Sequence, residues 1–185
     1  MYNEDISVYI EDALEDMKTS GVPPDILKKD TDDPRVLTAV TLYVKAYLYH
    51  NMKEYDNAIE FYKKAIAADP EYAEAYSNLG LIYCLQAQDF SEKATTDIND
   101  PKYKEDQATL KTFYEKAKPY YEKVAEMLLA KNEPRYNSAL IECYSYLGYY
   151  YLLKSDYPVS KEYWNKILAI DPTNATANKA LDGIK

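Results

Sequence analysis

Apolar side chains recur every three or four residues through most of this chain, which is the spacing of one face of an α-helix. The first such stripe is followed by Gly21 and Pro23, residues that favour the end of a helix. Its members are Ile6, Tyr9, Ile10, Ala13, Leu14 and Met17. We therefore predict an amphipathic helix over about residues 3–18, which either covers the open apolar face of the helices after it or is the remnant of a similar helical unit upstream.

The clearest pattern lies in residues 55–83, YDNAIEFYKKAIAADPEYAEAYSNLGLIY. A first helix is predicted up to the Asp69-Pro70 pair, because proline lacks an N–H and disfavours helical geometry in the residue before it. A second helix follows, with Tyr76, Leu79, Gly80 and Tyr83 on one face. The order of small, aromatic and proline positions resembles the tetratricopeptide repeat (TPR), whose period is about 34 residues.

Three segments fix the register of the repeats: YDNAIEFYKKA from Tyr55, YEKAKPYYEKV from Tyr114 and YPVSKEYWNKI from Tyr157. The second of them comes late, so an insertion near residues 87–111 is expected, extending both helices of the second hairpin around a loop at about 95–101. The alternative that the insertion forms an extra repeat places Tyr114 at a small-residue position and is rejected.

The resemblance implies an all-α fold, a right-handed TPR superhelix with about three hairpins, an extended second hairpin and a C-terminal capping helix. One domain over residues 1–185 is expected. Its parts are an N-terminal helix and linker (1–33), repeat 1 (39–72), repeat 2 (73–131), repeat 3 (134–174) and the cap (175–185).

Several polar residues fit helix termini better than metal sites. Asp33 before Pro34 reads as an N-cap with proline at the first helical position. A calcium loop starting at Asp30 would need glycine and glutamate where Arg35 and Thr41 stand. Asp100-Pro101 and Asn174 are expected to cap later helices, and Pro119 is expected to kink a helix or restart it.

Charge and chemistry narrow the function classes. Lys and Arg total 22 against 31 Asp and Glu, so the net charge is −9, which disfavours nucleic acid and anionic membranes and favours a neutral or basic partner. No apolar run is long enough to span a membrane. With one histidine, His50, and no catalytic or cofactor motif, we expect no enzyme activity, no cofactor and no metal.

Cys84 and Cys143 lie in apolar helical patterns and are read as buried thiols, with a disulfide as the alternative. The N-terminal MYNEDISVYIED is too acidic for a signal peptide, which indicates a cytoplasmic protein or a fragment of an exported one. The NLGLIY, KAKPYYEKV and DPTNATANKALDGIK segments resemble the C-terminal TPR portion of bacterial envelope-associated proteins, which implies the periplasm or cell envelope.

The TPR resemblance implies a concave groove lined by the first helix of each hairpin. The residues expected there are Val40, Tyr43, Tyr47, His50, Glu74, Ser77, Asn78, Leu81, Glu142, Ser145, Tyr149 and Leu152. Of the Lys, Asn and Arg residues that clamp peptide carboxylates in some TPR domains, only Asn78 is present, so such a clamp is not expected.

The groove is rich in tyrosine, which offers an apolar face and a hydroxyl group at low entropic cost. The leading hypothesis is therefore a non-enzymatic scaffold that binds a protein or peptide segment. Two alternatives stay open: a glycan-binding module for nutrient uptake, and a structural module that self-associates through the inserted hairpin. The sequence leaves the oligomeric state undetermined.

Overall fold

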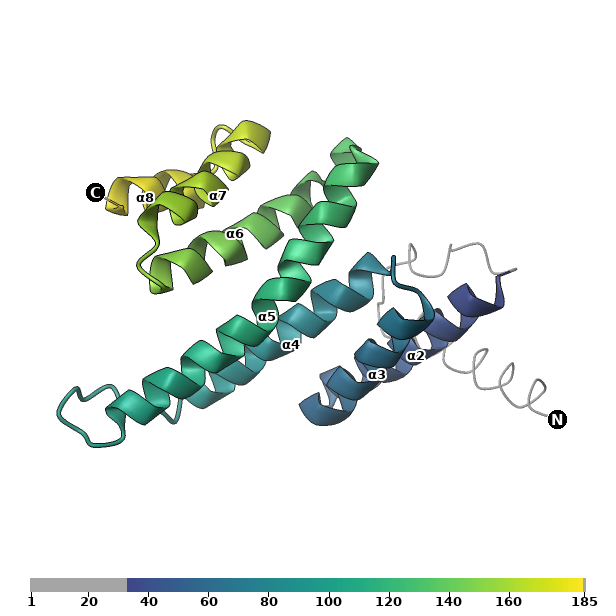
Figure 1. Cartoon of the computed structure of the whole chain (residues 1–185), viewed down its shortest axis with the longest axis horizontal. Coiled ribbons are helices and arrows are strands. Elements are labelled where there is room, and N and C mark those ends of the chain that lie inside the picture. Colours follow the sequence, from purple (N-terminus) through teal and green to yellow (C-terminus); the bar gives the residue numbers. More distant parts are fainter. Residues whose placement is uncertain (1–32, 185) are drawn as a thin grey trace. The chain divides into compact units, whose positions relative to one another are not determined.

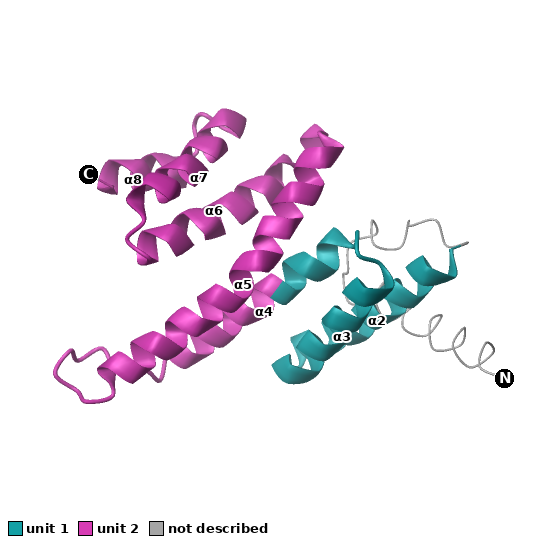
Figure 2. Ribbon diagram, in the orientation of Figure 1, with its two compact units in different colours: residues 1–79 teal, residues 80–185 magenta. Residues whose placement is uncertain are grey.

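A computed structural model describes residues 33–184, and every regular element in that range is a helix. The chain divides into two compact units, residues 1–79 and residues 80–185, with the division inside one helix (Figures 1 and 2). The helix predicted over residues 3–18 lies outside the described residues. The observed helices agree with the predicted all-α TPR fold, while the single-domain organisation and its boundaries stay predictions.

Unit 1 contains a helical hairpin, α2 (Pro34–Asn51) and α3 (Tyr55–Ala68), and the first part of α4 (Ala73–Ser91). The α2 and α3 helices pack side by side (Figure 1). Asp33 caps α2 as predicted, because its side chain accepts a hydrogen bond of 2.9 Å from the Arg35 N–H, and Pro34 occupies the first turn. The α3 helix ends just before Asp69-Pro70.

Unit 2 contains the rest of α4, then α5 (Tyr103–Lys131), a 3₁₀ turn η2 (Pro134–Tyr136), α6 (Asn137–Leu153), α7 (Tyr157–Ile170) and α8 (Ala175–Gly183). The α6 helix packs against both α5 and α7 (Figure 1), and α8 packs against α7. Asn174 caps α8, accepting a 3.1 Å hydrogen bond from the Ala177 N–H, as the sequence predicts.

The second hairpin is extended, as expected from the insertion. Within unit 2, the α4 and α5 helices are joined by residues 92–102 and pair through aromatic rings: the centroids of Phe90 and Phe113 are 6.1 Å apart. Asp106, on α5, is only 4% exposed and accepts a 2.9 Å hydrogen bond from the Thr95 N–H. This buried carboxylate therefore ties the connecting loop to the helix after it.

The start of α5 differs from the prediction. Asp100 does not cap the helix; its side chain accepts a hydrogen bond from the Lys102 N–H and its carbonyl oxygen accepts one from the Tyr103 N–H. These two bonds close a separate turn, so α5 begins at Tyr103. Pro119 neither stops nor restarts the helix, which runs without a break through residue 131.

Glycine allows the closest helix contact in unit 2. A methyl group at Gly148, on α6, would lie 2.6 Å from Cε2 of Trp164, on α7. Ser160 joins the same two residues, because its hydroxyl donates to the Gly148 carbonyl at 2.8 Å and accepts from the Trp164 indole N–H at 3.1 Å. Ser160 and Trp164 are fully buried, so both polar groups are satisfied inside the core.

We predict that Gly148→Ala lowers the free energy of unfolding by about 1–2 kcal/mol, because overpacking outweighs the gain in helix propensity. The fluorescence of the single tryptophan, Trp164, follows denaturant unfolding. The matched control is Gly183→Ala, where an added methyl group meets nothing within 4 Å. Equal stability of Gly148→Ala and the wild type would contradict the close approach.

We also predict that Ser160→Ala destabilises the fold by about 1–2 kcal/mol, although alanine is the better helix former, because the buried indole N–H loses its acceptor. Thermal unfolding measures the change. Ser138→Ala, at an exposed position of α6, serves as the control and should be neutral or slightly stabilising. A Ser160→Ala chain as stable as this control would show that the hydroxyl bridge is dispensable.

Candidate functional site

The predicted groove residues of unit 1 lie on two helices, Val40, Tyr43, Tyr47 and His50 on α2 and Glu74, Ser77 and Asn78 on α4. They differ in burial. Val40 and Tyr43 are buried, with 8% and 2% of their surface exposed, whereas Glu74 is exposed and the other four are half-buried. The surface that unit 1 offers at these positions is therefore carried by residues other than Val40 and Tyr43.

Tyr43 is the centre of an aromatic cluster. Its ring lies 5.4 Å from Tyr62, 5.0 Å from Tyr72 and 6.4 Å from Tyr47, the last in stacked geometry. Burial, and then the negative charge of Glu74, raise the pKa of the Tyr43 hydroxyl far above its usual value. Tyr43 thus packs against the half-buried Tyr47 ring, and it stays a neutral phenol at physiological pH.

Asn78 links the two helices of this surface. Its side-chain amide donates to the Tyr43 hydroxyl at 2.7 Å and to the Glu74 carbonyl at 3.0 Å. Both amide hydrogens are therefore used within the protein. Asn78 is the one residue that matches the carboxylate clamp of other TPR domains, and this arrangement leaves it no hydrogen to donate to a ligand carboxylate.

His50 ends the row of predicted residues on α2. Its ring lies edge-on to Tyr47 with the centroids 6.1 Å apart, and burial lowers its pKa. Within residues 33–184, its Nδ1 atom is buried and has no hydrogen-bond partner. No group of three or more His, Cys, Asp or Glu side chains in that range could hold a metal ion.

The predicted groove residues of unit 2 are Leu81, Glu142, Ser145, Tyr149 and Leu152. Glu142 and Tyr149 are exposed, and the other three are half-buried. Tyr149, on α6, is 48% exposed, and its ring meets the buried Trp164 ring edge-on at a centroid distance of 4.8 Å. An exposed aromatic ring held by a rigid neighbour suits contact with a partner.

Unit 2 also contains a polar aromatic contact that the sequence pattern did not single out. The rings of Tyr121 and Tyr146 stack with their centroids 4.2 Å apart, and the Tyr146 hydroxyl donates to the carbonyl of Tyr114. Burial raises the pKa of the neighbouring Cys84 thiol to about 11 and that of Cys143 to about 12, and both cysteines are free. The predicted buried thiols are confirmed for Cys143, while Cys84 is half-buried.

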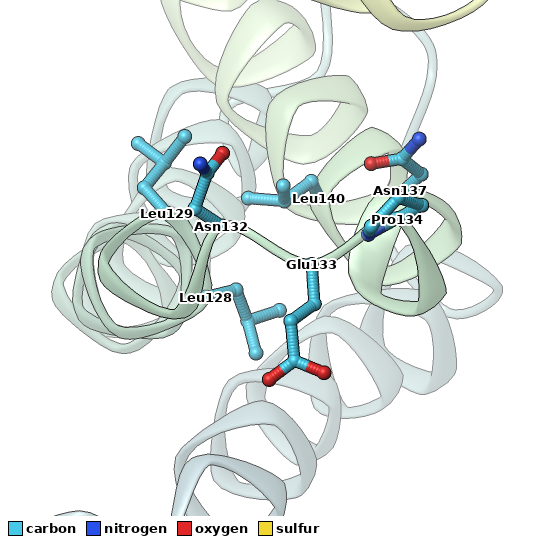
Figure 3. A pocket seen from close by; sticks show the side chains of 7 residues that line it. All are labelled: Leu128, Leu129, Asn132, Glu133, Pro134, Asn137 and Leu140. Carbon is cyan, nitrogen blue, oxygen red and sulfur yellow. The ribbon is translucent and has the colours of Figure 1, made fainter.

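A pocket of about 130 Å³ opens at the turn between α5 and α6 (Figure 3). Three leucines form its apolar wall, and Leu129 among them is 55% exposed. The carboxylate at its rim, Glu133, is paired with Arg135 at 2.8 Å. The lining residues are Leu128, Leu129, Asn132, Glu133, Pro134, Asn137 and Leu140, none of which the sequence pattern assigned to a site.

Comparison with known proteins agrees with the helical-repeat architecture. Residues 39–86 match the family model of the TPR repeat. No curated protein sequence matches the chain significantly. Among the described residues, no helix combines the length and the apolar character that a bilayer span requires.

Solved structures with a similar fold include TPR proteins. The TPR domain of Arabidopsis OM64 is 16% identical, covers 80% of this chain and 93% of its own length, and has a TM-score of 0.50. The first TPR domain of Spaghetti (RPAP3), bound to the HSP90 peptide SRMEEVD, is 19% identical over 80% of this chain and 90% of its own, with a TM-score of 0.44. The C-terminal part of a TPR repeat-containing protein from Cytophaga hutchinsonii is 22% identical, covers 100% of this chain and 89% of its own length, and has a TM-score of 0.32.

The raised thiol pKa values predict slow alkylation. At pH 8, native Cys84 should react with iodoacetamide roughly a hundredfold more slowly than a free cysteine, because little of the thiol is ionised, and the rate should rise toward pH 11. Cys143, 1% exposed, should react more slowly still. Peptide mass spectrometry measures both rates, with the denatured chain as control. Rapid labelling of native Cys143 would contradict its burial.

Proposed function

We propose, on the premise of a tetratricopeptide repeat fold, that this chain is a non-enzymatic module that binds a segment of another protein along the first helices of its hairpins. The observation that carries the proposal is Tyr149, an exposed ring on α6 that is held against the buried Trp164. Such a ring loses little side-chain entropy when a partner covers it, which is how tyrosine contributes strongly to protein interfaces.

A repeated pattern on two first helices supports the same function. The α4 helix carries Glu74, Ser77 and Leu81, and α6 carries Glu142, Ser145 and Tyr149, in each case at spacings of three and four residues. Each triplet combines a carboxylate, a hydroxyl and a large apolar side chain on one helical face. A repeated combination of hydrogen-bonding and apolar groups suits a peptide, because a peptide offers main-chain hydrogen-bonding groups together with apolar side chains.

The charge on each of these two helix faces also determines the kind of partner. Neither Glu74 nor Glu142 forms an ion pair within the part of the chain that the structure describes, and the whole chain has a net charge of −9. An acidic segment would therefore be repelled from either helix face, whereas a neutral or basic one would not. This supports a neutral or basic protein segment as the partner.

We predict that Tyr149→Ala weakens binding of peptides selected from a random phage-displayed library on the purified chain. The loss should be about tenfold or more in affinity, as for an aromatic anchor at the centre of an interface. Fluorescence anisotropy with the synthesised peptides measures it.

The matched control is Tyr157→Ala. Tyr157, on α7, is 46% exposed, nearly the same as Tyr149, but lies outside the predicted groove. Its removal should change affinity by less than about twofold. Equal losses in both variants, or none in Tyr149→Ala, would contradict the assignment of Tyr149. If the library yields no binders and a soluble oligosaccharide array does, the ligand is a glycan.

A further inference from the structure

We propose that the surface formed by Tyr47, Glu74 and Asn78 in unit 1 selects a segment with a lysine or arginine side chain, and that it does so through acceptor groups. This inference rests on the proposed peptide-binding function and names the chemistry of the residue that is recognised. It reverses the polarity of a clamp for carboxylates, which presents hydrogen-bond donors and positive charge.

The first argument is the direction of the hydrogen bonds. Because Asn78 donates both amide hydrogens internally, to Tyr43 and to the Glu74 carbonyl, the group it has left is its carbonyl oxygen. The Glu74 carboxylate accepts hydrogen bonds only. The two side chains are one helical turn apart on α4 and thus share a face. Two acceptors side by side require donors, and ammonium and guanidinium groups consist of donors alone.

The second argument is the unbalanced charge of Glu74. Some glutamates of the described chain are paired, such as Glu60 with Lys64 at 2.5 Å and Glu122 with Lys118 at 2.8 Å. Glu74 is exposed and has no such partner in residues 33–184. Its field reaches the hydroxyls of Tyr43 and Tyr72, where it adds to the effect of burial in raising their pKa values. A partner's cation would balance this charge.

The third argument is the aromatic ring of Tyr47, which belongs to the same cluster as Tyr43. Tyr47 is half-buried and is stacked on Tyr43, which is hydrogen-bonded to Asn78. The chain places cations over rings elsewhere: the Nζ atom of Lys45 is 4.3 Å from the Phe61 centroid, and that of Lys166 is 4.5 Å from Tyr163. No described lysine or arginine lies over the Tyr47 ring, and a cation from a partner placed there would gain the same kind of contact.

The fourth argument is a buried hydroxyl next to this surface. Tyr62 is fully buried, and its hydroxyl has no hydrogen-bond partner within residues 33–184. It interacts electrostatically with the hydroxyls of Tyr43 and Tyr47, and burial together with these two groups raises its pKa. An unpaired buried hydroxyl is costly, and this one leaves an unsatisfied polar group in the tyrosine cluster that carries the Tyr47 ring.

The test compares degenerate nonapeptide pools that differ only in a fixed central residue: arginine, lysine, citrulline or glutamate. Citrulline keeps the shape of arginine and removes its charge. Anisotropy with the full chain should give an affinity about three- to tenfold higher for the arginine and lysine pools than for citrulline, the range expected for one exposed ion pair with a cation–π contact.

Glu74→Gln should abolish this preference by lowering the affinity of the arginine and lysine pools to that of the citrulline pool. The matched control is Glu71→Gln, which removes the same charge from an exposed position three residues earlier and should keep the preference. Glu74→Lys should favour the glutamate pool. Equal binding of all four pools would overturn the cation-selecting surface but leave peptide binding intact. Binding of no pool would overturn both, and a preference retained in Glu74→Gln would overturn the role of Glu74.

Discussion

The close contact of Gly148 with Trp164 is the constraint on which unit 2 depends. Because an added methyl group would lie 2.6 Å from the indole ring, only glycine lets α6 and α7 approach this closely. Ser160 fixes the distance by hydrogen-bonding to both residues. The next residue along the chain, Tyr149, then rests edge-on against the same indole. The packing that closes the hairpin is thus also the support of the exposed ring in the proposed interface.

Unit 1 builds its surface in a related way, from an aromatic cluster instead of a single indole. Tyr43 is buried among tyrosine rings, and its hydroxyl holds the Asn78 amide in one orientation. In that orientation both amide hydrogens of Asn78 are donated within the protein, and its carbonyl oxygen is left as an acceptor on the same helical face as Glu74. The hydrogen bonding of a buried side chain therefore decides which chemistry the surface can recognise.

Local signals in the sequence were enough for much of the fold. Asp33-Pro34, Asp69-Pro70 and Asn174 act within a few residues of themselves, and each marks a helix terminus as predicted. The repeat register predicts an insertion near residues 87–111, because the aligned segments have a fixed spacing. The prediction that Asp100 caps a helix was wrong, because the same residue types that cap helices also close turns, and tertiary context decides between the two.

The site was less predictable. Helical spacing placed Tyr43 and Tyr47 on one face but could not show that the first is buried and the second half-buried, because that depends on Tyr62 and Tyr72 from other elements. The direction in which Asn78 donates is likewise set by a residue 35 positions away. The most direct test of the central claim is the amide NMR spectrum of the labelled chain as a selected peptide is added. The account predicts shifts concentrated in the first helices, α2, α4 and α6; shifts confined to α3 and α7 would contradict it.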